Sequence, residues 1–232
     1  MRLFRFAAVV IATPLLATAC SLGSTSSSPH AGTSPTSTNP DAGLLTGTQL
    51  SAMLAPASWF PGGYAVDPTG SRNTGTTYEP PTTSGSLPCS RLNGTAWIDL
   101  ARVGPVSFAQ NDYIDASTSE EYAQEIDVYQ GGGAQQAMTA LRGLATTCPS
   151  FTDSQTSSTV TVRYQNGPSL GDDGLTFLLS SPAWAAGTAL EAVRVGSAVI
   201  TVLYSGASGN GTPQATSLAA VVTRNVQSKI KS

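Results

Sequence analysis

Histidine is almost absent from this chain of 232 residues, and the single example, His30, lies in a run of small polar residues. Lysine is nearly as rare, with Lys229 and Lys231 at the C-terminal end. Catalytic triads and histidine general bases need an imidazole group. The chain beyond residue 41 therefore excludes every histidine-dependent active site or zinc site, and its chemistry rests on carboxylates, hydroxyls and amides.

Positive charge is also scarce. The chain has 11 basic and 14 acidic residues, and loss of Arg2 and Arg5 with a signal peptide would leave a net charge of −5. No basic patch and no interleaving of basic with aromatic residues is present, so we expect no nucleic-acid partner. Walker loops, dinucleotide fingerprints and G-x-S-x-G elbows are missing too. We expect no cofactor and no metal.

The first twenty residues have the order of an export signal. Arg2 and Arg5 precede an apolar run over residues 6–16, and small residues lead into Cys20. The run is too short for a confident spanning helix. Ala17-Thr18-Ala19-Cys20 resembles a bacterial lipobox, although Ala17 stands where leucine is most usual. The alternative is a free Cys20 thiol after an ordinary cleaved signal.

The lipobox resemblance implies a lipoprotein signal peptide over residues 1–19 and a lipidated Cys20, carrying palmitate-type acyl chains, as the first mature residue. Two or more chains give stable anchoring, so the membrane is an expected partner. The expected location is the outer face of the cytoplasmic membrane. Residues 20–41 are rich in Ser, Thr, Gly and Pro, which predicts a flexible linker. Residues 42–232 then form one domain.

Two further cysteines remain in the domain, Cys89 and Cys148. An even pair in an exported chain predicts a disulfide bond. Two buried free thiols are the alternative. Two cysteines alone do not provide enough ligands for a metal site.

Hydrophobic periodicity predicts an α+β domain. Expected helices cover residues 44–55, with Thr46 or Thr48 as N-cap, and residues 131–147 and 213–230. Expected strands cover residues 105–115, 120–130, 160–164, 175–181, 189–195 and 198–204. Residues 95–103 are ambiguous between strand and short helix, and residues 60–88 are expected to be mostly loop. This order predicts an antiparallel sheet with helices packed on one face.

The strand over residues 120–130 alternates apolar and acidic residues. Tyr122, Ile126 and Val128 lie on one face, and the other face carries Glu121, Glu125 and Asp127. We interpret this as a half-buried strand with an acidic outer face. The carboxylates that would suit a hydrolase are Asp99, Asp112, Asp115, Glu120 and Glu121, but we favour the interpretation that they lie in turns and on solvated surfaces.

Several short motifs are spread along the domain: a Leu-Leu-Thr opening (Leu44–Thr46), a cysteine before a tryptophan (Cys89, Trp97), a strand–helix unit ending in Cys148 and an Arg-Val-Gly-Ser-Ala-Val hairpin from Arg194. In these features the domain resembles the extracellular sensor domain of actinobacterial serine/threonine kinases of the PknH type. The segments Ser107–Tyr113 and Cys148–Phe151 also resemble streptomycete lipoproteins of unknown role. The extracellular sensor domains of these kinases often carry two disulfides, whereas this chain can form one.

The resemblance implies a sheet with an open cleft and a binding or sensing role, without catalytic residues. The ligand would be a small molecule or cell-envelope component, and we expect no enzyme. If the cleft is functional, the expected lining residues are Trp97, Asp99, Tyr113 and Trp184. The alternatives are a structural or protein-interaction lipoprotein that holds another envelope protein, and a carboxylate-based hydrolase.

Overall fold

The computed structural model describes residues 39–83, 85–206 and 209–230. The predicted signal peptide, Cys20 and nearly all of the predicted linker lie outside the described residues. Within the described part, no helix combines the length and apolar character needed to cross a membrane.

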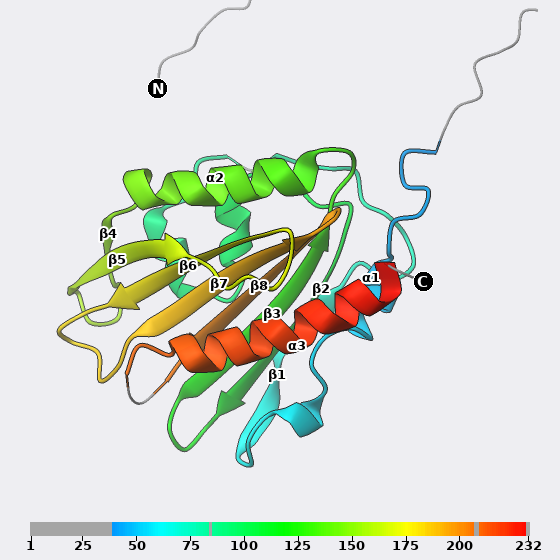
Figure 1. Cartoon of the computed structure of the whole chain (residues 1–232). Coiled ribbons are helices and arrows are strands. Elements are labelled where there is room, and N and C mark those ends of the chain that lie inside the picture. Colours follow the sequence, from blue (N-terminus) through cyan, green and yellow to red (C-terminus); the bar gives the residue numbers. More distant parts are fainter. Residues whose placement is uncertain (1–38, 84, 207–208, 231–232) are drawn as a thin grey trace, which may run out of the picture. The chain divides into compact units, whose positions relative to one another are not determined.

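The centre of the domain is an eight-stranded sheet in which every neighbouring pair is antiparallel. The strand order is β1-β2-β3-β8-β7-β6-β5-β4 (Figure 1). The chain therefore leaves the sheet after β3, returns at the far edge with β4, and runs back strand by strand until β8 lies beside β3. The strands are β1 (Tyr64–Asn73), β2 (Ser107–Asp115), β3 (Glu120–Val128), β4 (Ser150–Thr152), β5 (Thr159–Asn166), β6 (Asp173–Ser180), β7 (Thr188–Val195) and β8 (Ala198–Ser205).

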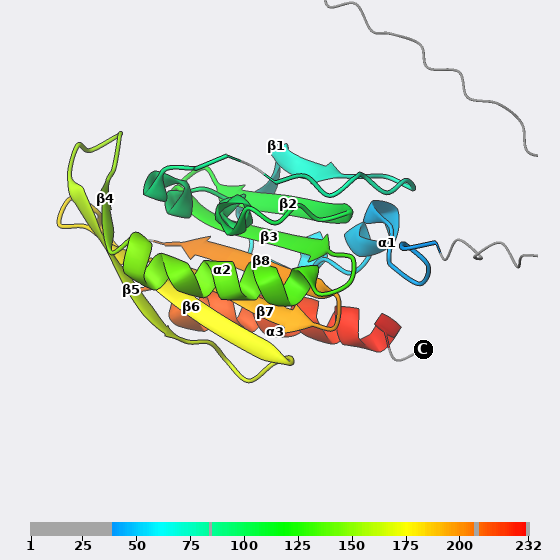
Figure 2. The ribbon, with the colours of Figure 1, turned by 90° about the horizontal axis from the view of Figure 1, so that it is seen from above.

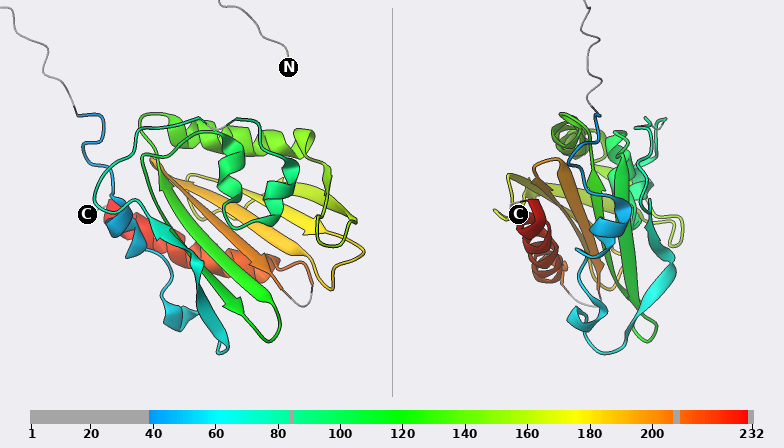
Figure 3. Two further views of the ribbon diagram at one scale, coloured as in Figure 1. Left: turned by 180° about the vertical axis from the view of Figure 1, so that it is seen from behind. Right: turned by 90° about the vertical axis from the view of Figure 1, so that its right-hand side faces the viewer.

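Helices cover both faces of this sheet. One face packs against α1 (Gly47–Ser51), the short helix η1 (Ala57–Trp59) and α3 (Thr212–Ile230). The other face packs against α2 (Gly133–Thr147) and the 3₁₀ segments η2 (Cys89–Asn93) and η3 (Trp97–Ala101). Figure 2 shows α2 and α3 on opposite sides of the sheet, and Figure 3 shows η2 and η3 in front of it with α3 behind.

The α+β class, the antiparallel sheet and the single disulfide are confirmed, but the expected packing of helices on one face is corrected. The reason lies in the central strands. β7 and β8 are buried along almost their whole length, with apolar residues on both faces. Two apolar faces need two covering layers, because exposed apolar surface on either side would cost free energy.

Local signals set most helix ends. Thr46 caps α1 through a capping box with Gln49, as its position predicts, although the helix stops at Ser51. Helix α2 ends just before Cys148-Pro149, and Gly196 adopts φ +58° in the β7–β8 hairpin. Residues 97–101 of the ambiguous segment form η3.

Residues 64–73 form the edge strand β1, where mostly loop was expected, because these residues pair with β2.

Strand β3 also departs from its sequence pattern. Its acidic face was predicted to be the outer face, but Glu125 is 3% exposed and Asp127 is 1% exposed. Glu121, nearer the start of the strand, is only partly buried. The segment that contains η2 and η3 covers this face, so an acidic strand face that looks solvated in the sequence becomes an interior wall.

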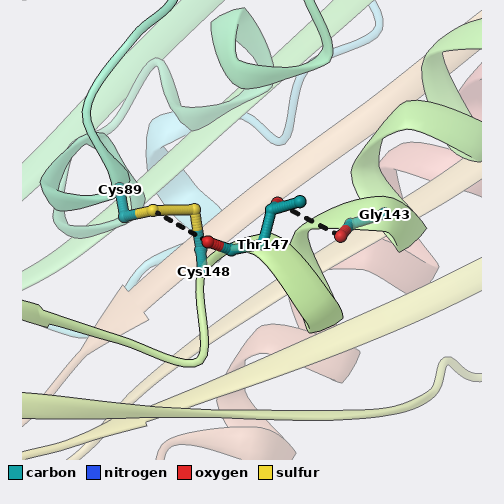
Figure 4. The surroundings of a disulfide bond; sticks show 4 residues. All are labelled: Cys89, Gly143, Thr147 and Cys148. Carbon is teal, nitrogen blue, oxygen red and sulfur yellow. Dashed lines mark hydrogen bonds between the residues drawn. A yellow bond between two sulfur atoms is a disulfide. The ribbon is translucent and has the colours of Figure 1, made fainter.

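A disulfide bond joins Cys89, at the start of η2, to Cys148, at the C-terminal end of α2 (Figure 4). The Cα atoms are 5.5 Å apart and the cysteines are 59 residues apart in sequence. The Cys89 sulfur lies 3.7 Å from the carbonyl oxygen of Thr147, as a close contact, since a disulfide sulfur has no proton to donate. Thr147 in turn donates its hydroxyl to the Gly143 carbonyl at 3.2 Å. The bond fastens the covering segment to α2.

Replacing both cysteines by serine should lower the free energy of unfolding by about 4 kcal/mol, because the unfolded chain would lose the closure of a loop of about 60 residues. Urea unfolding of the wild type and of Cys89→Ser/Cys148→Ser, each with and without reductant, measures the loss. Reductant should destabilise the wild type and leave the double variant unchanged. Equal stability of the oxidised wild type and the double variant would contradict the role given to this bond.

Candidate functional site

A cavity of about 290 Å³ lies between β1–β3 and the segments that cover them. It is lined by Arg72, Glu79, Thr82, Ile98, Asp99, Val103, Pro105, Phe108, Glu125, Asp127 and Tyr129. Arg72, Glu79, Thr82 and Asp99 are exposed and form its mouth. Glu125, Asp127 and Tyr129 are buried and form its floor. The size is at the lower end for a small-molecule site.

The floor contains two carboxylates from the same face of β3. Oε2 of Glu125 and Oδ2 of Asp127 are fully buried and accept no hydrogen bond within the described part of the chain. Burial raises the pKa of both groups well above their usual ranges, and the negative charge of Asp127 raises the pKa of Glu125 further. Two buried acids without hydrogen-bond donors are costly to a fold, which makes them candidates for function.

The nearest positive charge is Arg72, but it does not neutralise this pair. Its Nε donates to Oε1 of Gln110 at 2.9 Å, and its guanidinium lies 5.0 Å from the centre of the Phe108 ring. Arg72 still lowers the pKa of both floor carboxylates, but burial is the larger effect. Within the described part of the chain, neither Glu125 nor Asp127 forms an ion pair within 4.0 Å.

Tyr129 completes the floor. The residue follows β3 directly, is 1% exposed, and its hydroxyl has no hydrogen-bond partner among the described residues. Burial raises the pKa of this hydroxyl above its usual value, and the charges of Asp127 and Glu125 raise it further. Buried tyrosine hydroxyls usually have a partner, so this one, which can donate or accept, has unused hydrogen-bonding capacity at the edge of the acidic floor.

The segments that cover β1–β3 form the cavity wall opposite the floor, and buried contacts hold them in place. Trp97 is fully buried and packs edge-on against Phe177 with ring centres 6.2 Å apart, which fixes η3 on the sheet. The backbone of Glu79 donates to the carbonyl of Val106 at 2.7 Å. Gly104 lies directly against the backbone of Thr82, where a Cβ atom would collide. Glycine is therefore required for this close approach of two wall segments.

The four predicted ligand residues do not form one site. Asp99 lines the cavity and pairs with Arg91 at 2.8 Å. Trp97 lies in the core beneath η3, and Tyr113 lies on the opposite face of the sheet, stacked on Phe60 at 3.7 Å. Trp184 is half-buried and donates its Nε1–H to Asp153 at 3.0 Å, away from the cavity.

The other carboxylates considered for a hydrolase also lie outside the cavity lining. Asp112 is buried on β2, accepts from Nε2 of Gln110 at 2.9 Å, and its pKa is raised by burial to about 6. Burial raises the pKa of Glu121 to about 7. Asp115 binds Ser117 in a turn, and Glu120 accepts from the Tyr64 hydroxyl at 2.6 Å.

The sequence pattern of Glu125 and Asp127 predicted an outer surface, and no pattern indicated Arg72 or Tyr129. The usable signal was three acidic residues on one face of a strand whose other face is mostly apolar. Such a pattern normally marks a solvated face. Within the described residues, no group of three or more His, Cys, Asp or Glu side chains could hold a metal ion.

The raised pKa values make stability depend on pH in a definite direction. The pKa of Glu121 is raised to about 7 and that of Asp112 to about 6, from usual values near 4. Between the usual and raised values, the folded domain keeps protons that the unfolded chain has released. The free energy of unfolding should therefore increase as pH falls from about 8 to about 5, with Glu125 and Asp127 acting in the same direction.

Glu125→Gln should stabilise the domain at pH 8 by more than about 1 kcal/mol, because even one unit of raised pKa corresponds to about 1.4 kcal/mol. It should also flatten the pH dependence. Denaturant titrations at several pH values provide the measurement. Asp115→Asn is the matched control. Hydrogen bonds from Ser117 lower the pKa of Asp115, so its contribution to the free energy of unfolding is lost only below pH 4. A Glu125→Gln protein less stable than wild type at pH 8 would contradict this account.

No family model matches the chain, and no curated protein matches it. Among solved structures, it is similar to the extracellular domain of PknH from Mycobacterium tuberculosis, with a TM-score of 0.54. The match covers 79% of this chain and 97% of that chain at 14% sequence identity. A likeness at this identity concerns the fold alone, and it supports the resemblance in fold predicted from the sequence: the domain has a fold like that of the PknH extracellular domain.

Proposed function

We propose that this protein is an extracytoplasmic lipoprotein that acts as a ligand-binding, sensor-like module, with the acidic cavity as its binding site. One observation carries the assignment of the site. Glu125, Asp127 and Tyr129 come from one strand end and form the floor of a cavity, with three buried polar atoms that have no partner in the described part of the chain. Their cost to the fold is offset if a ligand supplies the missing hydrogen bonds.

The likeness in fold to the extracellular domain of PknH supports the proposed location outside the cytoplasm. The lipobox-like Ala17-Thr18-Ala19-Cys20 supports a lipid anchor that tethers the domain to the membrane through residues 20–41. The disulfide between Cys89 and Cys148 agrees with an oxidising environment.

Binding is favoured over catalysis by the placement of the acids. Hydrolases with two carboxylates place them on either side of the scissile bond, with pKa values pushed apart. Here Glu125 and Asp127 project from the same face of one strand, and burial raises the pKa of both. A cavity of about 290 Å³ also leaves little room for a bond to be flanked by two groups.

A protein-docking role has less support from the surface. The large apolar side chains that are more than a third exposed in the described part are Val66, Ile114, Tyr164 and Ile230. They come from β1, β2, β5 and α3, and Val66 and Ile114, on the neighbouring strands β1 and β2, lie at register positions that face opposite sides of the sheet.

The anchor is tested by Cys20→Ala. The wild type should be recovered with membranes, and the variant should be recovered in the soluble fraction, since it lacks the acylated residue. Ser21→Ala is the matched control and should stay with the membranes. Mass spectrometry of the N-terminal peptide should find acyl chains on the wild type and on Ser21→Ala, but not on Cys20→Ala. Membrane retention of the Cys20→Ala protein would contradict the anchor.

Native mass spectrometry of protein purified from its own organism tests the binding site. The wild type should carry a co-purifying small molecule, and the Glu125→Gln/Asp127→Asn variant should lack it. Glu121→Gln is the matched control, because Glu121 lies on the same face of β3 but does not line the cavity. A molecule retained equally by both variants would place binding elsewhere, and a stoichiometric protein partner with no small molecule would favour an interaction role.

A further inference from the structure

The charges around the cavity are unbalanced. The lining residues include four carboxylates and one cation: Glu79, Asp99, Glu125, Asp127 and Arg72. Asp99 already pairs with Arg91 at the mouth. The deeper part of the cavity therefore holds the unbalanced acids, since both of them lack a cation at contact distance among the described residues.

Arg72 is held away from the floor by its own contacts. Gln110, opposite it on β2, accepts from its Nε, and Phe108 lies beneath its guanidinium. Arg72 is an exposed side chain of the edge strand β1. It therefore contributes a positive charge at the mouth and leaves the hydrogen-bonding capacity of the floor unused.

A second observation, independent of the acids, also indicates a missing ligand. The Tyr129 hydroxyl is buried without a partner, and Tyr129 lines both this cavity and an adjoining one of about 390 Å³. Thr82 and Val103 are shared by the two cavities as well, and the second extends to Gly132 and Gly133 at the start of α2. The two cavities therefore share part of their wall at Tyr129.

On the basis of the proposed function, we propose that the ligand is a small organic cation, a primary amine or guanidinium, whose charged end lies against Glu125 and Asp127. Its body lies along the cavity wall beside Tyr129. An ammonium group has three donors and no acceptor, which matches a floor made of carboxylate oxygens. Ile98, Val103 and Pro105 give the cavity apolar walls suited to a hydrocarbon chain.

A metal ion fits the same floor less well. Calcium takes six to eight oxygen ligands, and magnesium needs near-octahedral geometry. In the described residues no group of three or more acidic, His or Cys side chains is placed to hold a metal ion. Two carboxylates on one strand satisfy an ammonium group more completely than a divalent cation.

Cation binding should release protons. In the empty cavity, burial and mutual repulsion favour a protonated acid on the floor. Arg72 from β1 opposes this protonation, while Asp99 from η3 and Asp112 from β2 add repulsion. A bound ammonium replaces the retained proton as the positive partner. Affinity for the cation should therefore fall as the pH is lowered from about 8 to about 5.

The test is a calorimetric titration of the detergent-solubilised full-length protein with n-butylamine and agmatine. The neutral analogue 1-butanol and the anion butyrate serve as matched probes. We expect the two cations to bind with dissociation constants of about 10 mM or lower, and we expect no binding of 1-butanol or butyrate. Glu125→Gln/Asp127→Asn should weaken cation binding more than about tenfold, whereas Glu121→Gln should leave it unchanged. Titrations in buffers of different ionisation enthalpy should detect proton release.

Several results would overturn the inference: no heat from either amine at these concentrations, equal binding of 1-butanol, unchanged affinity in the double variant, or tighter binding of Ca²⁺ or Mg²⁺ than of the amines. The proposed function fails in a different way. If a neutral or anionic molecule co-purifies with the wild type and is lost from the double variant, the cavity is a binding site but its ligand is not a cation.

Discussion

The covering of β3 on its second face is the constraint on which the rest of this domain depends. The segment with η2 and η3 lies over that face, the buried Trp97 holds it to the sheet, and the Cys89–Cys148 disulfide fastens it to α2. Without this layer, Glu125 and Asp127 would lie on a solvated strand face and would be ordinary surface acids. With it, their carboxylates lose water and line a cavity.

This arrangement has an energetic cost that the fold itself does not recover. Buried, unpaired carboxylates destabilise the native state, and a core of neutral side chains would be more stable. In the proposed role, the same groups would attract a cation more than surface acids do, because little water competes inside the cavity. A trade of stability for binding is common at functional sites. It also separates the two roles experimentally, since neutral amides at these positions should strengthen the fold and weaken the site.

Much of the fold was predictable because its signals are local. The capping box at Thr46, the helical spacing that ends at Cys148-Pro149 and the hairpin at Gly196 each depend on neighbouring residues. The edge strand β1 was missed because its ladder to β2 comes from pairing across some 40 residues, which turn-rich composition conceals. The predicted ligand residues were scattered for a similar reason, since Tyr113 and Trp97 face opposite layers.

The amino-acid sequence by itself determined the export signal pattern, the exclusion of histidine chemistry and the α+β class, because these follow from composition and short-range spacing. It predicted the pairing of the two domain cysteines, which the structure confirmed. Only the tertiary structure decided that helices cover both faces and that the acidic face of β3 is interior. Alternation along a strand tells which residues share a face, but burial of that face depends on what packs against it. For Glu125 and Asp127, that packing changes two apparent surface charges into a candidate binding site.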